Sequence, residues 1–163
     1  MPERKTIKKA RKDARQGKSA STQAGEFVRE EIHHVREGKH GARSTKQAIA
    51  IGLSKARRAG VRLPAKKGVS KRTRAQAKRD LAKGRHPGRK TSRTRARAVS
   101  GALRRETHRS ASSRALSRQA HASARKRSAA QRSAAARKAA RTKGARKRSA
   151  AARKAARTRA RRR

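Results

Sequence analysis

The chain has 163 residues, of which 54 are Lys or Arg and only 8 are Asp or Glu, so its formal net charge is +46. Large apolar residues are scarce: Met, Ile, Leu, Val and Phe together fill 16 positions, and Phe27 is the only Phe, Trp or Tyr. One globular core spanning the whole chain is excluded, because burial of large apolar groups is what offsets chain entropy. The composition is typical of highly charged sequences that are disordered when free.

Several further classes are excluded by the same composition. No apolar run is long enough for a transmembrane helix, and no apolar segment follows the first residues to form a secretory signal. The absence of cysteine excludes disulfide scaffolds and Cys-ligated zinc modules. Nothing in the sequence could build a pocket holding a nucleophile, a base and an orienting group, so we expect no enzyme activity and no cofactor.

The first predicted helix covers about residues 3–16 and ends at Gly17, because a glycine just past the last helical residue is a common stop signal. This segment is strongly basic, and Ile7 is its only large apolar residue after Met1. We therefore expect it to fray.

The second predicted helix runs from about residue 22 to residue 37, with Ser21 or Thr22 as its cap and Gly38 as its stop. Its apolar residues recur at helical spacing and define a buried face: Ala24, Phe27, Val28, Ile32 and Val35. Its glutamates form the only acidic surface, which we interpret as a candidate face for a basic partner or a self-contact: Glu26, Glu30 and Glu31.

The third predicted helix covers about residues 45–59. Ser44 and Gln47 form a capping-box pattern at its start, and Gly60 fits the stop position at its end. Because the link to the second helix is short, the two helices should pack as a hairpin, with Gly52 allowing a close approach. The predicted buried face contains Ala48, Ile49, Gly52, Leu53 and Ala56.

Beyond residue 64 the composition changes. Residues 65–163 contain 37 basic and 2 acidic side chains, against 17 and 6 in residues 1–64. Residues 132–147 (RSAAARKAARTKGARK) and 148–163 (RSAAARKAARTRARRR) form a repeat that is identical over its first 11 positions. Basic residues fall all round a helical wheel, and each i,i+4 pair of like charges costs about 0.2–0.5 kcal/mol. This pattern predicts disorder in the free chain and partial helix once an anionic partner neutralises the repulsion.

The predicted fold class is therefore a small all-α head, a helical hairpin or three helices, followed by a long, mostly disordered basic region that becomes helical on binding. We place the head at residues 1–64, a basic Ser/Arg/Ala-rich linker at 65–126, and a low-complexity repeat tail at 127–163.

The sequence predicts binding to polyanions, because residues 65–163 form a long region whose charges are almost all positive. Duplex DNA carries one negative charge per about 1.7 Å, so the net charge of residues 65–163 matches about 60 Å, or roughly 18 base pairs. Arginine adds bidentate contacts to phosphate. The residues predicted to contact DNA are Arg85, Arg89, Lys90, Arg125, Lys126, Arg127, Arg132, Arg137, Lys138, Arg141, Lys143, Arg146, Lys147, Arg148, Arg153, Lys154, Arg157, Arg159, Arg161, Arg162 and Arg163.

Sequence-specific readout has little support. Residues 83–90 (KGRHPGRK) resemble a degenerate AT-hook whose core is interrupted by His86, and a plain basic turn is the alternative. A helix-turn-helix formed by the second and third helices is disfavoured, because the second helix is acidic and the link between them is rich in glycine.

A histidine-rich stretch could suggest a metal site. It contains His33, His34 and His40, with Glu30 and Glu37 nearby. Adjacent histidines on a helix point in different directions, so they cannot all converge. We therefore predict surface histidines and no metal ligands.

The block KHGARSTKQAIAIGLSKARRAG at residues 39–60 resembles a bacterial family of small basic proteins of unknown function, and the resemblance extends over about residues 21–64. It implies a bacterial cytoplasm, and hence the nucleoid, but no catalytic or ligand residues. The Ala/Arg/Lys-rich region is similar in style to linker-histone tails and to bacterial histone-like proteins, which supports a binding mode and not descent.

These observations favour a histone-like, nucleoid-associated protein that binds duplex DNA without sequence preference, neutralises it and compacts it. One alternative is an RNA- or ribosome-associated binding protein. Another is a protein-interaction head that the tail tethers to polyanions, and a homodimer through the head is also open. No membrane partner is expected.

Overall fold

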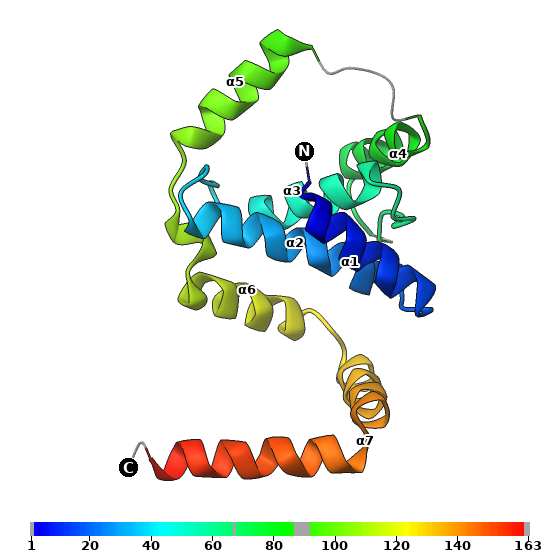
Figure 1. Cartoon of the computed structure of the whole chain (residues 1–163), viewed down its shortest axis with the longest axis vertical. Coiled ribbons are helices and arrows are strands. Elements are labelled where there is room, and N and C mark those ends of the chain that lie inside the picture. Colours follow the sequence, from blue (N-terminus) through cyan, green and yellow to red (C-terminus); the bar gives the residue numbers. More distant parts are fainter. Residues whose placement is uncertain (1, 67, 87–91, 162–163) are drawn as a thin grey trace. The chain divides into compact units, whose positions relative to one another are not determined.

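The computed structural model describes residues 2–66, 68–86 and 92–161, and it is 76% helical (Figure 1). It divides into two compact units, Met1–Gln119 and Ala120–Arg163. The helices are α1 Arg4–Arg15, α2 Ala20–Arg36, α3 Thr45–Arg58, α4 Lys71–Arg85, α5 Arg93–Arg104, the 3₁₀ helix η1 Arg109–Ala111, α6 Ser113–Arg125 and α7 Ala129–Ala160.

The ends of the first three helices follow local signals. The predicted stops at Gly17, Gly38 and Gly60 are confirmed, since their φ angles are 66°, 75° and 94°. The predicted cap of α3 is also confirmed, because Ser44 Oγ accepts a hydrogen bond from the Gln47 amide at 3.2 Å. The cap predicted for α2 at residue 21 or 22 was wrong.

The N-cap of α2 is Ser19, whose Oγ accepts a hydrogen bond from the Thr22 amide. The helix begins at Ala20 because this serine lies directly after the Gly17 turn. Helix α1, expected to fray, packs along α2 and contributes Ile7 and Ala10 to an apolar cluster around Phe27.

Helices α2 and α3 pack against each other as the predicted hairpin. A Cβ atom added at Gly52 would lie 2.7 Å from the Cα of Val28, so only glycine permits this approach of the two backbones. Two apolar clusters form around the hairpin. The first contains Ala10, Ala24, Phe27, Ala56 and Val61, and the second contains Ile32, Val35, Ala42, Ala48 and Ala111.

Helix α4 packs on α3 through a buried carboxylate. Asp80 is 1% exposed and accepts hydrogen bonds from Ser54 Oγ (2.6 Å), Arg58 Nε (2.8 Å) and Gln76 Nε2 (3.1 Å). These three donors satisfy a group that would otherwise be costly to bury. Asp80 therefore fastens α4 to α3.

The segment around η1 docks on the link between α2 and α3. The amides of Gly41 and Ala42 donate to the carbonyls of Leu103 (2.8 Å) and Thr107 (3.0 Å). Thr45 Oγ1 donates to the Ser110 carbonyl at 2.6 Å. A side chain at Gly41 would overlap the backbone of Glu106, so the link presents bare backbone to this segment.

The predicted disorder of residues 65–163 was wrong, because the described part of this region is mainly helical. Ala and Arg have high helix propensity, and serine caps start three of the helices described in this region: Ser70 at α4, Ser112 at α6 and Ser128 at α7. Each pair of like charges costs only about 0.2–0.5 kcal/mol. Over a whole helix, the favourable helix propensity and the serine caps outweigh this repulsion.

The second unit contains the end of α6 and all of α7. Gly144, with φ 66° and ψ 165°, interrupts α7 and divides it into two straight arms, 129–143 and 145–160. No helix within residues 2–66, 68–86 and 92–161 is long and apolar enough to cross a membrane.

Candidate nucleic-acid interface

Seven of the eight acidic side chains contact Lys, Arg or His side chains of the same unit. All eight lie at or before Glu106, and four of them are buried: Asp13, Glu30, Glu31 and Asp80. The interpretation of α2 as an acidic outer surface was therefore wrong, because Glu30 is 6% exposed and Glu31 is fully buried. Glu26, the third member of that set, pairs with Arg29 on the same helix.

Two exposed carboxylates, Glu3 and Glu37, are also paired. His34 Nε2 lies 3.0 Å from Glu3 Oε1, and this hydrogen bond is the main cause that lowers the pKa of the Glu3 carboxyl. Lys39 lies 3.0 Å from Glu37, and that hydrogen bond is the main cause that raises the pKa of the lysine. Few negative groups are left to oppose the basic surface.

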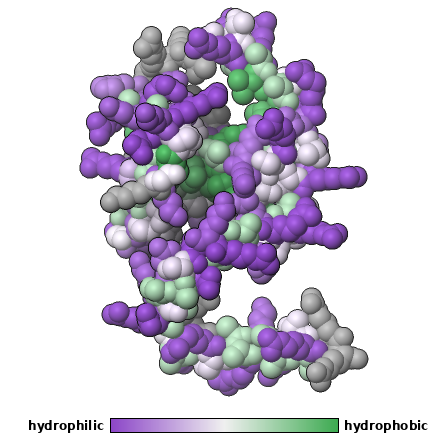
Figure 2. All heavy atoms as spheres, turned by 180° about the vertical axis from the view of Figure 1, so that it is seen from behind, coloured by the Kyte–Doolittle hydropathy of each residue, from purple (hydrophilic) through white to green (hydrophobic). Residues whose placement is uncertain are grey.

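The second unit has no such compensation. Residues 120–163 contain 18 Lys and Arg and no acidic residue. Figure 2 shows hydrophilic side chains standing out along the last arm of α7, the lowest part of the picture, with pale alanines between them. The basic groups follow both arms of α7 without forming one face.

The structure describes most of the predicted DNA-contacting residues of this unit as exposed side chains. Arg125 ends α6, Lys126 and Arg127 lie in the turn before α7, and Arg161 caps α7. Exposed on α7 itself are Arg132, Arg137, Lys138, Arg141, Arg146, Arg148, Arg153, Lys154, Arg157 and Arg159.

Other predicted contacts cannot be placed. Arg89, Lys90, Arg162 and Arg163 lie outside the described residues, as do the side chains of Lys143 and Lys147. Half of the segment that resembles an AT-hook, residues 87–90, falls in the gap at 87–91.

The two arms of α7 correspond approximately to the two sequence repeats. In one continuous helix, a shift of 16 residues turns the side chains by about 160°, so equivalent residues of the repeats would face nearly opposite directions. The kink at Gly144 interrupts the helix, so the equivalent side chains of the two repeats are no longer held in these opposite directions. Each arm is about 24 Å long at 1.5 Å per residue.

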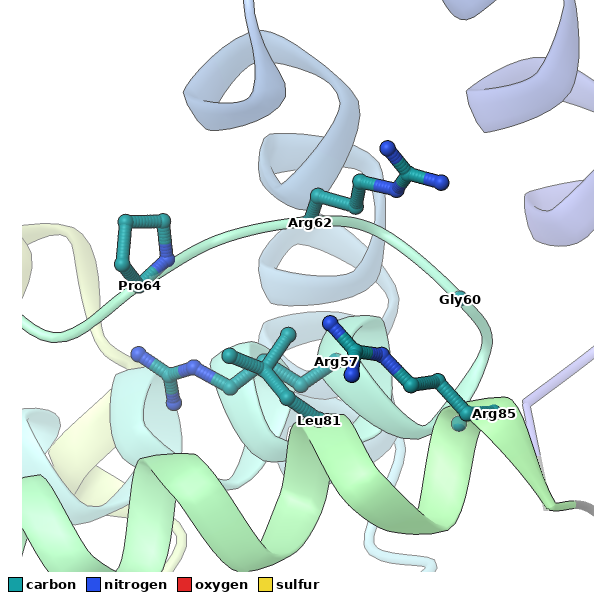
Figure 3. Close-up of a pocket in the computed structure, with 7 residues that line it drawn as sticks. Arg57, Gly60, Arg62, Pro64, Leu81 and Arg85 are labelled. Carbon is teal, nitrogen blue, oxygen red and sulfur yellow. The ribbon is translucent and has the colours of Figure 1, made fainter.

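Arg85, the remaining predicted contact, lines a cavity of about 430 Å³ in the first unit together with Arg57 and Arg62 (Figure 3). The loop from Gly60 to Pro64 passes over this cavity. The guanidinium groups of Arg57 and Arg85 lie beneath the loop on either side of Leu81, and Arg62 projects from the loop itself.

This arginine cavity is held together by the backbone. Arg57 Nε donates to the Leu63 carbonyl at 2.8 Å, which fixes its guanidinium group. A Cβ at Gly84 would overlap the carbonyl of Arg57, so glycine allows α4 to bring Arg85 close. None of the described residues that line the cavity carries a carboxylate, so the cavity favours an anion such as a phosphate.

Sequence reasoning missed Arg57 and Arg62. Both lie in a chain where 54 of 163 residues are Lys or Arg, so their positions carry no distinguishing signal. The cavity depends on the return of the chain from α3 to α4, which the sequence did not predict.

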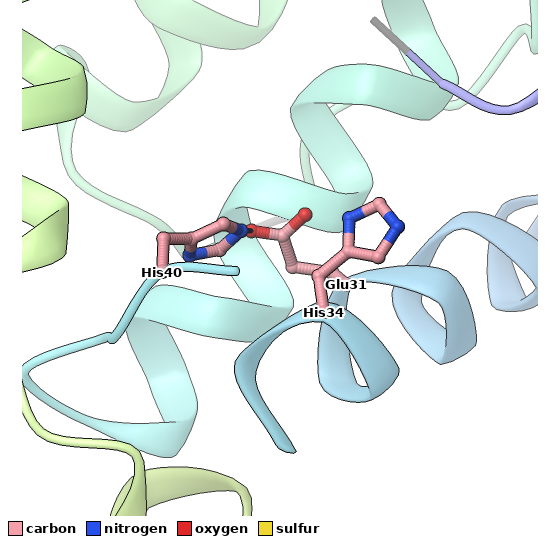
Figure 4. A group of neighbouring side chains, drawn as sticks. All are labelled: Glu31, His34 and His40. Carbon is pink, nitrogen blue, oxygen red and sulfur yellow. Dashed lines mark ion pairs between the residues drawn. The ribbon is translucent and has the colours of Figure 1, made fainter. Parts of the chain in front are cut away.

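Two of the three clustered histidines also come together. The rings of His34 and His40 have centroids 6.2 Å apart, with Glu31 beside them (Figure 4). His33 is exposed, so the three histidines do not all converge, as predicted, but the prediction of surface histidines was wrong for His34 and His40, whose side chains are only 13% and 18% exposed. Glu31 was not among the residues considered for this group.

Comparison with known proteins finds one match, to a protein family. A family of unknown function (DUF6496) matches residues 3–67, which contain α1, α2 and α3. No curated protein and no solved structure matches the chain. The match agrees with the resemblance of this region to a family without an assigned function.

Proposed function

We propose that the protein is a histone-like, nucleoid-associated DNA-binding protein of the bacterial cytoplasm. It binds duplex DNA without sequence preference, neutralises the phosphates and promotes compaction. The observation that carries this proposal is the separation of charge: seven of the eight acidic side chains contact Lys, Arg or His side chains within the first unit, while residues 120–163 contain 18 cations and no acid.

The binding mode follows from electrostatics. Eighteen cations match about 30 Å of duplex, or roughly 9 base pairs, at one phosphate charge per 1.7 Å. Binding releases condensed counterions from the DNA, so affinity falls steeply as salt rises. Aromatic stacking platforms are absent from the sequence outside the buried Phe27, which disfavours specific recognition of single strands.

The test is a salt titration of binding to a labelled 30-base-pair duplex by fluorescence anisotropy. A variant with Arg137, Arg141, Arg153 and Arg157 changed to Gln loses four cations from α7. Its slope of log affinity against log salt should become shallower by about 3 to 4. A charge-matched control changes four exposed lysines of α1 to Gln: Lys5, Lys8, Lys9 and Lys12.

We expect the control to alter the slope by less than about 1, because α1 is not part of the acid-free unit. Wild-type affinity that does not respond to sodium chloride would contradict the proposal. Tighter binding to structured RNA than to duplex DNA at equal salt would instead support the RNA-binding alternative.

A further inference from the structure

We propose that Glu31, His34 and His40 form a zinc site. One potential ligand atom from each residue lies within 4.8 Å of the others. Figure 4 shows both imidazole rings beside the Glu31 carboxylate, one from α2 and one from the link that follows it. Two imidazole nitrogens and one carboxylate oxygen are a ligand set that zinc uses, with a fourth position left for water.

The distance between two of these ligands matches a zinc site. Glu31 Oε1 and His40 Nε2 are 3.3 Å apart. Zinc bonds of about 2.0–2.1 Å arranged tetrahedrally place neighbouring ligand atoms about 3.3 Å apart. These two atoms are therefore already spaced as one edge of a zinc tetrahedron, and only the His34 ring must move inward.

The buried carboxylate of Glu31 keeps one oxygen available for a metal ion. Glu31 is fully buried; its Oε2 pairs with Lys55, while its Oε1 lies 3.3 Å from His40 Nε2 and accepts no hydrogen bond. His40 Nδ1 lies 3.0 Å from the Gly41 carbonyl, which only accepts hydrogen bonds, so Nδ1 carries the proton. The neutral ring then turns a lone pair at Nε2 toward Glu31, and a metal ion or a second proton must lie between them.

Each proposed ligand has an outer partner that would orient it. His34 Nε2 is hydrogen-bonded to Glu3 Oε1, which leaves Nδ1 for the metal. His40 is held by the Gly41 carbonyl, and the second oxygen of Glu31 pairs with Lys55. Carboxylate and carbonyl partners of this kind fix the tautomer of metal-binding histidines. Lys55 therefore acts as a partner to the ligand and leaves Oε1 for the metal.

The local charge also favours a divalent cation. Three of the eight carboxylates of this basic protein contact the two histidines, Glu3, Glu30 and Glu31, and a fourth, Glu37, joins the same network of ion pairs through Lys39. The lysines paired with them are Lys39 and Lys55. With both imidazoles neutral, two negative charges remain, and a divalent ion balances them.

The test uses Co²⁺ as a spectroscopic substitute for zinc in the full chain, purified in high salt and freed of metal with a chelator. Wild type should bind one Co²⁺ and develop the visible absorption bands of a low-coordinate cobalt site, and added Zn²⁺ should remove them. His33→Gln, which changes an exposed neighbour on the same helix, should bind equally well.

His34→Gln and His40→Gln should each lower Co²⁺ affinity by more than about tenfold. Mutating a residue that only hydrogen-bonds to a metal ligand already lowers metal affinity by about that much. Far-UV circular dichroism checks that these variants keep their helices. Two results would overturn the proposal: no visible cobalt bands in wild type, or Co²⁺ affinity in His40→Gln equal to that in His33→Gln.

Discussion

At the scale of single residues, Asp80 makes the clearest energetic contribution. Asp80→Ala would leave Ser54 and Gln76 without their acceptor and would unpair Arg58, which is itself half-exposed. We expect the free energy of opening α4 to fall by about 2–3 kcal/mol, since part of the loss is recovered by hydration of the arginine. Amide hydrogen exchange of α4 measures this directly.

The matched control for this change is Glu37→Ala, which also removes one carboxylate and one ion pair. Both partners of that pair, Glu37 and Lys39, are about half-exposed. Exposed ion pairs contribute little to stability. The free energy of opening α4, obtained from the exchange rates, should therefore change by less than about 0.5 kcal/mol. Equal protection of α4 in the two variants would show that Asp80 does not fasten the helix.

The arginine cavity gives a second prediction at this scale. Changing Arg62 and Arg85 to Gln should weaken duplex binding and reduce the salt slope by about 2, because two phosphate contacts are lost. The control changes Arg72 and Arg74, two exposed arginines at the start of α4, and should reduce the slope by less than about 1. Anisotropy at several salt concentrations separates the two cases.

At the scale of elements, the contact between α2 and α3 depends on one glycine. Gly52→Ala should destabilise the protein by about 1–3 kcal/mol, because the new Cβ meets backbone atoms of Val28 that cannot move aside cheaply. Gly25→Ala on α2 has open space around it and should stabilise by about 0.5–1 kcal/mol. Thermal unfolding followed by circular dichroism should therefore shift in opposite directions; a shared upward shift would contradict the close approach.

The same helices show which parts of the fold can be predicted from the nearby sequence. The first three helices were predictable because each has a signal within a few residues, such as Ser44 at a start or Gly60 at an end. The docking of η1 was not, since it depends on Ala111, a small residue with no distinguishing pattern. The basic helices differ from the sequence prediction because the helix propensity of alanine and arginine outweighs the repulsion between like charges.

The candidate sites also differ in whether the sequence alone could predict them. The cations of α7 are evident from composition alone, because their number matters more than their placement. The arginine cavity and the cluster of Glu31, His34 and His40 require the chain to turn back after a helix. Their members are up to 28 residues apart at the cavity, from Arg57 to Arg85, and nothing in the sequence connects them.

At the scale of the whole molecule, a mechanism based on the number of charges makes a demanding prediction. If residues 127–163 are shuffled while their composition is kept, the duplex affinity should change by less than about threefold and the salt slope should stay the same. The reason is that counterion release depends on how many phosphates are neutralised, and the shuffled chain keeps the same cations and the same helix-forming residues. Anisotropy with wild-type and shuffled chains at matched salt measures both quantities. A loss of affinity of tenfold or more in the shuffled chain would show that the 16-residue repeat places its cations in a required order, and the account based on charge number would have to be abandoned.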